Sequence, residues 1–106
     1  MDAVFGISSS ALRTTQTRQN VTAHNVANIN TDGFSSSRVI QAEQKPAGVS
    51  AAAIQKNQNS DPQGQSNTDF AVEATNMIMN KSTYGANSKV LKVQDQMLGE
   101  LLNIVG

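Results

Sequence analysis

The most regular pattern in this chain is an apolar position that returns every seven residues over its last third. A strict seven-residue repeat places one persistent stripe on a helix and implies left-handed supercoiling against another helix. The cluster Asn67-Thr68-Asp69 supplies N-cap residues just ahead of the stripe, so the sequence predicts a helix over residues 70–105. The members of the repeat are Phe70, Met77, Tyr84, Leu91, Leu98 and Val105, and a second apolar stripe beside it comprises Ala86, Val90, Val93, Met97, Leu101 and Ile104.

Residues 4–29 contain no proline and predict a second long helix near the N-terminus. Its apolar stripe is incomplete, because Phe5, Leu12 and Val26 share one heptad position while Gln19 occupies the fourth place in that row. Most helical stability in water comes from packing an apolar face, so we expect this helix to depend on a neighbour. Residues 30–33, Asn-Thr-Asp-Gly, tolerate left-handed and tight-turn conformations and predict a defined stop.

The segment between the helices is polar and low in complexity. Two short runs, residues 37–44 and 49–55, have modest strand character and flank Lys-Pro-Ala-Gly at 45–48, which is a turn signal. The sequence therefore predicts a small β-hairpin, with an irregular linker as the alternative. The fold class that follows is mainly α, with residues 1–33 as the N-terminal helix and turn, 34–67 as a linker and 68–106 as the C-terminal helix, the two helices forming one domain.

Composition indicates a chain that cannot bury a large core of its own. It has 106 residues, 38% of them hydrophobic, with three Phe, one Tyr and no Trp. Small domains of this kind are marginal alone, and oligomerisation is a standard remedy. Eight basic residues balance eight acidic ones, so we expect no general attraction for nucleic acid.

The absence of cysteine excludes disulfides, thiolate metal ligands and a cysteine nucleophile. An acid, Asp2, stands where the basic region of a secretory signal would be, so we expect no cleavable signal peptide. No run approaches the roughly 20 apolar residues of a membrane span, and we expect a protein that is not embedded in a membrane.

Candidate chemistry is sparse. His24 is the single histidine and has no acidic residue three or four positions away, and the serine triplets at 8–10 and 35–37 lack a Gly-x-Ser-x-Gly frame. We therefore expect no catalytic residue, cofactor or metal site, and no enzyme activity. The asparagines at the end of the first helix leave two interpretations open: they cap the helix, or their amides bind neighbouring subunits. They are Asn20, Asn25, Asn28 and Asn30.

Two segments at opposite ends of the chain resemble bacterial flagellar rod and hook proteins. Residues 27–34, Ala-Asn-Ile-Asn-Thr-Asp-Gly-Phe, resemble the family signature Ala-Asn-x-x-Thr-x-Gly-aromatic, and residues 84–98 resemble its C-terminal motif. Asp32 stands where many members have Pro, and Lys-Ser-Thr at 81–83 replaces the usual Gln-Arg-Ala. The middle is too short for the extra domains of hook proteins, so the chain is most similar to a short proximal-rod subunit. The matching positions are Ala27, Asn28, Thr31, Gly33, Phe34, Tyr84, Asn87 and Lys89.

The resemblance implies an antiparallel coiled coil of the terminal helices that polymerises, with copies of itself and other rod and axial proteins, into a torque-transmitting helical shaft. It further implies type III export through the flagellar apparatus and a place in the basal body, spanning the periplasm. The alternative is a helical-hairpin adaptor or export chaperone that binds a partner helix. We expect the seven-residue apolar row of the C-terminal helix to pack on the N-terminal helix. The residues expected to pack subunits are Phe5, Leu12, Val26, Phe70, Met77, Tyr84, Leu91, Leu98, Leu102 and Val105.

Overall fold

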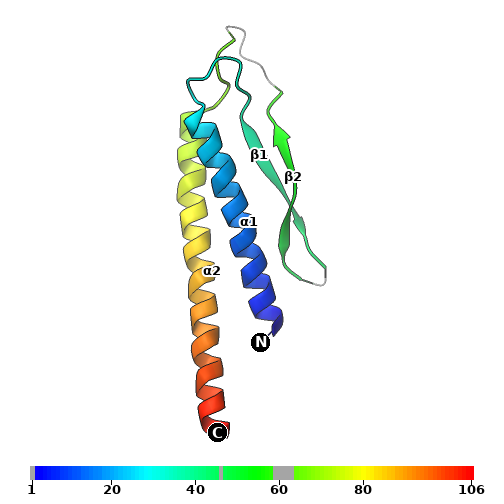
Figure 1. Cartoon of the computed structure of the whole chain (residues 1–106), viewed down its shortest axis with the longest axis vertical. Coiled ribbons are helices and arrows are strands. Elements are labelled where there is room, and N and C mark those ends of the chain that lie inside the picture. The colour runs from blue at the N-terminus through cyan, green and yellow to red at the C-terminus, as the bar shows by residue number, and fades with distance from the viewer. Residues whose placement is uncertain (1, 46, 59–63) are drawn as a thin grey trace.

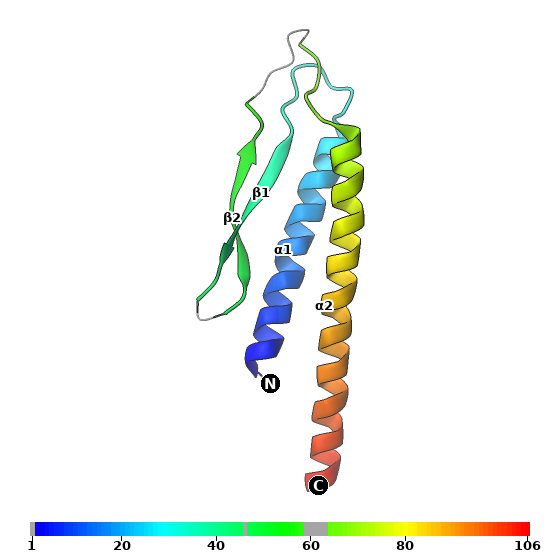
Figure 2. The ribbon, with the colours of Figure 1, turned by 180° about the vertical axis from the view of Figure 1, so that it is seen from behind.

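The computed structural model describes residues 2–45, 47–58 and 64–106 and contains two helices and a hairpin. Along the chain these are α1 (Asp2–Ala27), β1 (Ser37–Glu43), β2 (Val49–Lys56) and α2 (Phe70–Val105). Both ribbon views place α1 and α2 side by side in opposite directions, with the hairpin beside α1 and the end of α2 extending past the start of α1 (Figures 1 and 2). The molecule measures 68 × 24 × 14 Å. The predicted mainly α fold is confirmed, and so is the hairpin, whereas the irregular linker is wrong.

Capping hydrogen bonds and backbone conformation explain where α1 ends and where α2 begins. Asp69 caps α2 from an extended backbone, φ −98° and ψ 113°, and its side chain accepts a hydrogen bond from the Ala71 amide at 2.9 Å. At the end of α1 the side chain of Asn28 donates to the carbonyl of His24 at 2.9 Å. Gly33 then adopts a φ of 73°, a conformation that glycine reaches at little cost, and this confirms the predicted stop.

The hairpin pairs Ser37 with Lys56 at one end and Glu43 with Val49 at the other, with a register shift between Ile40 and Gln41. Its turn end is fixed to α1 by two hydrogen bonds. The Val49 amide donates to Oγ of Ser10 at 3.1 Å, and Oγ1 of Thr14 donates to the Val49 carbonyl at 3.2 Å. Pro46 of the predicted turn and residues 59–63 of the predicted linker lie outside the described residues.

The interior of the molecule is polar. No hydrophobic side chain that the structure describes is buried, and the buried positions are Ser8, Ser10, Thr14, Thr15, Thr22, Asn25, Glu73, Asn80 and Gln94. Small and amide-bearing side chains therefore hold the elements together, while the large apolar side chains lie at the surface. Within the described part of the chain, neither helix has an apolar stretch long enough to cross a lipid bilayer.

Candidate subunit-packing surfaces

The two helices contact each other along a polar seam. On α1 the buried residues Ser8, Thr15 and Thr22 are spaced seven apart, and on α2 Asn80 lies seven residues after Glu73 and fourteen before Gln94. Two hydrogen bonds cross between the helices: the Asn25 amide donates to Oε1 of Glu73 at 3.0 Å, and the Asn80 amide donates to Oε1 of Gln19 at 3.1 Å. Seven-residue spacing is thus present at this interface, but the residues that carry it are hydrophilic.

Asn25 joins three elements and is only 1% exposed. Besides its bond to Glu73, its amide donates to the Ser37 carbonyl at 2.7 Å, and its Oδ1 accepts from the Ser37 amide at 2.9 Å. Its side chain bonds to Glu73 and Ser37 and does not cap α1, so the capping interpretation is wrong for Asn25, and a contact with a neighbouring subunit stays a prediction. Asn28 does cap the helix, as the first interpretation predicted.

The predicted apolar row of α2 begins outside the contact with α1. Phe70, Met77 and Tyr84 are 63%, 42% and 43% exposed, whereas Leu91 and Leu98 are half-buried. The α2 positions that are buried are Glu73, Asn80 and Gln94, each three residues after a member of the apolar row, so the row lies beside the centre of the helix contact. Within the single chain α1 leaves Phe70, Met77 and Tyr84 exposed, and the packing of the whole row stays a prediction.

The other residues expected to pack subunits divide in the same way. Phe5, Leu12 and Val26 of α1 are half-buried, while Leu102 is 63% and Val105 is 80% exposed. A role for all of these residues between subunits stays a prediction.

Two apolar surfaces remain open on α2. The first, here the lateral groove, is a depression of about 670 Å³ between the helices. It is lined by Thr15, Gln16, Gln19, Met77, Ile78, Asn80, Lys81, Tyr84 and Gly85. The second, here the C-terminal stripe, comprises Val90, Val93, Met97, Leu101 and Ile104, whose exposed fractions range from 41% to 81%.

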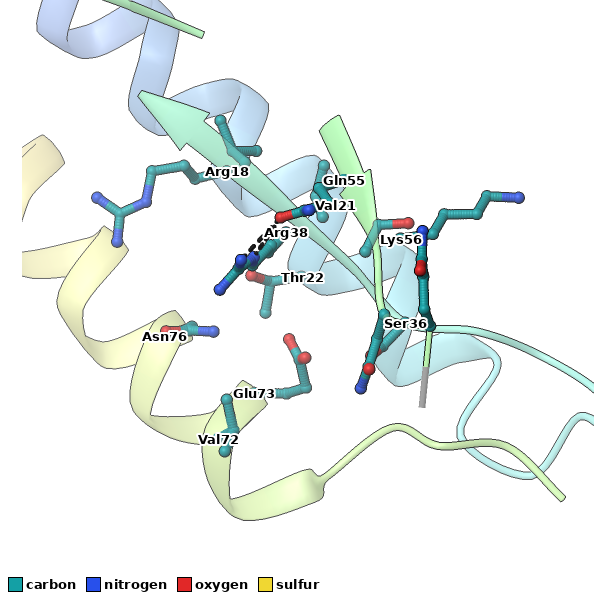
Figure 3. A pocket seen from close by; sticks show the side chains of 14 residues that line it. Arg18, Val21, Thr22, Ser36, Arg38, Gln55, Lys56, Val72, Glu73 and Asn76 are labelled. Carbon is teal, nitrogen blue, oxygen red and sulfur yellow. Dashed lines mark hydrogen bonds between the residues drawn. The ribbon is translucent and has the colours of Figure 1, made fainter. Parts of the chain in front are cut away.

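A polar cleft of about 570 Å³ lies where the hairpin meets both helices (Figure 3). Arg38 spans the strands there, donating from Nε and Nη2 to Oε1 of its cross-strand partner Gln55 at 3.0 and 2.7 Å. The Glu73 carboxylate enters the cleft from α2, and its Oε2 accepts no hydrogen bond from the described residues. Burial raises the pKa of Glu73, and the hydrogen bond from Asn25 offsets part of that rise.

The cleft offers hydrogen bonds and charge: Arg18, Arg38, Lys56 and one acid, Glu73, are among the residues that line it. No cluster of three or more His, Asp and Glu side chains suited to a metal forms within residues 2–45, 47–58 and 64–106. The ring of His24 packs edge-on against Phe34 at 5.3 Å between centroids, which is a structural contact.

The N-terminal family-motif positions build the turn that follows α1. The Thr31 amide donates to the Asn28 carbonyl at 3.0 Å, and the Phe34 amide donates to the Thr31 carbonyl at 3.2 Å. The Gly33 amide donates to the Gly64 carbonyl at 2.6 Å, which ties the turn to the loop before α2. Ala27 is the last residue of α1.

The C-terminal motif positions lie on α2 without joining that turn. Tyr84 and Lys89 are exposed, and Asn87 is half-buried with its amide donating to the Thr83 carbonyl at 2.9 Å. Sequence reasoning missed the polar seam, although its signal was present: Ser8, Thr15 and Thr22 repeat at the heptad interval, as do Glu73 and Asn80.

Comparison with known proteins gives two family matches, one at each end of the chain. Residues 5–34 match the family described as "Flagella basal body rod protein". Residues 64–104 match "Flagellar basal body rod FlgEFG protein C-terminal". A search of curated proteins found no match. The N-terminal match ends at Phe34, the last residue of the turn after α1, and the C-terminal match covers α2 almost to its end. The chain therefore belongs to the flagellar basal body rod protein family.

Proposed function

We propose that this chain is a structural subunit of the rod that polymerises through α1 and α2 into a helical axial shaft. Membership of the family indicates a structural protein of the basal body that assembles with other rod proteins. Polymerisation, torque transmission and a periplasm-spanning position are the further steps that we propose.

The observation that carries the proposal is the inverted distribution of apolar side chains. None of the described hydrophobic residues is buried, and Phe70, Ile78 and Leu102 are more than 60% exposed. Fully burying a side chain of this size stabilises by about 1.5–3 kcal/mol, whereas association costs about 4–15 kcal/mol. Covering several such residues on each subunit is therefore enough to offset the loss of free motion.

The length and the antiparallel alignment of α1 and α2 are consistent with a subunit of an elongated shaft. At 1.5 Å per residue α2 is roughly 54 Å long, and it lies antiparallel to α1 along most of the molecule (Figure 1). We propose that neighbouring copies complete coiled-coil packing around these helices, with the apolar row of α2 facing other subunits. Stacked in this way, continuous helices would carry torsion from one subunit to the next.

The same features suit export by the flagellar type III apparatus. The chain has no cysteine to form disulfides, and its intramolecular contacts are hydrogen bonds and small side chains. A chain without a hydrophobic core unfolds at modest cost, which a narrow export channel requires. The short segment between the two family matches favours a proximal-rod subunit.

Imaging of purified basal bodies tests the proposal. A strain that lacks the native gene and carries an epitope-tagged chain should place the label in the rod and swim normally. The alternative, an adaptor or export chaperone, would instead give a discrete complex of fixed size with a client and no label in washed basal bodies. That result would overturn the rod assignment.

A further inference from the structure

The lateral groove and the C-terminal stripe occupy different sides and different ends of α2. Met77, Ile78 and Tyr84 form the α2 wall of the groove in the first half of the helix, and the stripe runs from Val90 to Ile104 in the second half. At 100° per residue, the centre of the stripe lies roughly half a turn around the helix from the centre of the groove. One molecule therefore presents a hollow apolar surface on one flank and a ridge on the other.

We propose that the lateral groove of one copy receives the C-terminal stripe of a second copy. This docking rests on the proposed rod function and names the contact by which copies of this chain would join. Hydrophobic complementarity is the first argument, because Val93, Met97 and Ile104 are more than half exposed and can fill the depression beside Met77 and Tyr84.

Charge complementarity is the second argument and favours another copy of this chain as the occupant. Lys81 lines the groove, and Glu100 lies beside the stripe between Met97 and Leu101. Both side chains are exposed, and neither has an ion-pair partner among the residues that the structure describes. Docking places Glu100 of one copy beside Lys81 of the next and fixes their register.

The positions of the lateral groove and the C-terminal stripe determine the symmetry of the contact between copies. Because they lie on opposite flanks, a twofold dimer cannot fill both grooves at once, and the contact is head-to-tail. With the copies parallel, pairing Glu100 with Lys81 sets an axial stagger of roughly 30 Å at 1.5 Å per residue. Each added copy offers a fresh groove, so the assembly is open-ended.

Charge reversal tests the register. Lys81→Glu and Glu100→Lys each place like charges in contact, and we expect each to raise the concentration at which the purified chain sediments as polymer by at least tenfold. The double variant Lys81→Glu/Glu100→Lys restores opposite charges and should recover most of the loss. Lys45→Glu, in the exposed hairpin turn, is the matched control and should polymerise like the wild type. Polymerisation of both single variants at the wild-type concentration would overturn the docking.

Cysteine cross-linking tests the same contact directly, because the natural chain has no thiol. A chain with both Ile78→Cys and Met97→Cys, which are 19 residues apart like Lys81 and Glu100, should give a ladder of covalent oligomers on oxidation, whereas a mixture of the two single-cysteine chains should stop at the dimer. Equal dimer yields from either single variant alone would indicate a twofold contact and contradict the proposal.

The two proposals fail in different ways. A tagged double-cysteine chain that enters basal bodies without forming the ladder would reject the docking and keep the rod function. A chain absent from basal bodies would reject the rod function itself, even if the purified protein forms the ladder. A purified chain that stays monomeric at every concentration would reject the docking.

Discussion

Asn25 on α1 and Glu73 on α2 meet across the helix pair, with 3.0 Å between the amide nitrogen and Oε1, in an interface that holds no buried hydrophobic side chain. Buried polar groups stabilise a structure only when they are paired, and losing one partner leaves the other desolvated and unsatisfied. This pair and the hydrogen bonds between Asn25 and Ser37 therefore hold together the end of α1, the start of α2 and the start of β1.

Replacing Asn25 with Ala should lower the free energy of unfolding by about 1–3 kcal/mol, because Glu73 and the Ser37 backbone lose their partners in a buried site. Urea titration followed by helical circular dichroism measures the change. Asn30→Ala, at an exposed position on the same turn, is the control and should change the titration little. Equal midpoints for the two variants would contradict the role assigned to Asn25.

Glu73→Gln should stabilise the chain at neutral pH and remove one source of pH dependence. Burial raises the pKa of Glu73 above its ordinary value of 4.5, so between that value and the folded pKa the native state holds more protons than the unfolded state. Stability therefore falls as pH rises through this window, and the loss is complete above the folded pKa. Gln carries no charge and still offers Oε1 to Asn25.

Unfolding titrations of both proteins at a series of pH values between 4 and 8 check this difference. Glu73→Ala serves as a second variant: it should also lack the pH-dependent term, yet be less stable than Glu73→Gln because Asn25 loses its acceptor. Parallel pH curves for the wild type and Glu73→Gln would show that the carboxyl does not carry the effect.

Two glycine-to-alanine substitutions should change the stability of the chain in opposite directions. At Gly33, where φ is 73°, alanine meets no atom within 4 Å but must adopt a left-handed backbone, so we expect a loss of about 1–2 kcal/mol. At Gly6, inside α1 and equally unobstructed, alanine should add up to about 1 kcal/mol through its higher helix propensity. Thermal melts of the two variants measure both signs, and the same sign at both positions would refute the turn geometry.

The exposed row of α2 can be tested in the cell. Tyr84→Asp should abolish swimming, because it places a charge on a surface expected to be buried between subunits. The Tyr84 side chain is 43% exposed in the single chain, so the substitution should leave the helix content of the monomer unchanged. Soft-agar motility and circular dichroism measure the two effects. Ser82→Asp adds the same charge at an exposed position nearby and should swim. A motile Tyr84→Asp strain would remove Tyr84 from the subunit contacts.

Much of the fold could be predicted from local signals. The cap at Asp69, the stop at Gly33 and the turn residues at 45–48 act within a few residues of chain, and they located both helices and the hairpin. The partner of each helix face could not be predicted in the same way. Periodicity identifies an apolar stripe but not the surface that covers it, and for Phe70, Met77 and Tyr84 that surface is absent from the single chain.

The polar seam was missed for a related reason. Helix contacts are usually recognised from hydrophobic periodicity, and the repeat of Ser8, Thr15 and Thr22 gives no hydrophobic signal. In the proposed shaft the apolar side chains serve contacts with other subunits, and small and amide-bearing residues form the intramolecular interface. A hydrophilic heptad row three residues from an apolar one on the same helix is the pattern that distinguishes this arrangement.

The absence of a hydrophobic interior also determines how the isolated chain responds to heat and denaturant. The heat capacity change of unfolding and the denaturant dependence of stability both scale with the surface newly exposed, and here most large apolar side chains already contact solvent before unfolding. The free monomer should therefore melt over a wide temperature range with a shallow denaturant slope. A sharp transition should emerge only once neighbours surround the helices, which makes cooperativity a property of the polymer.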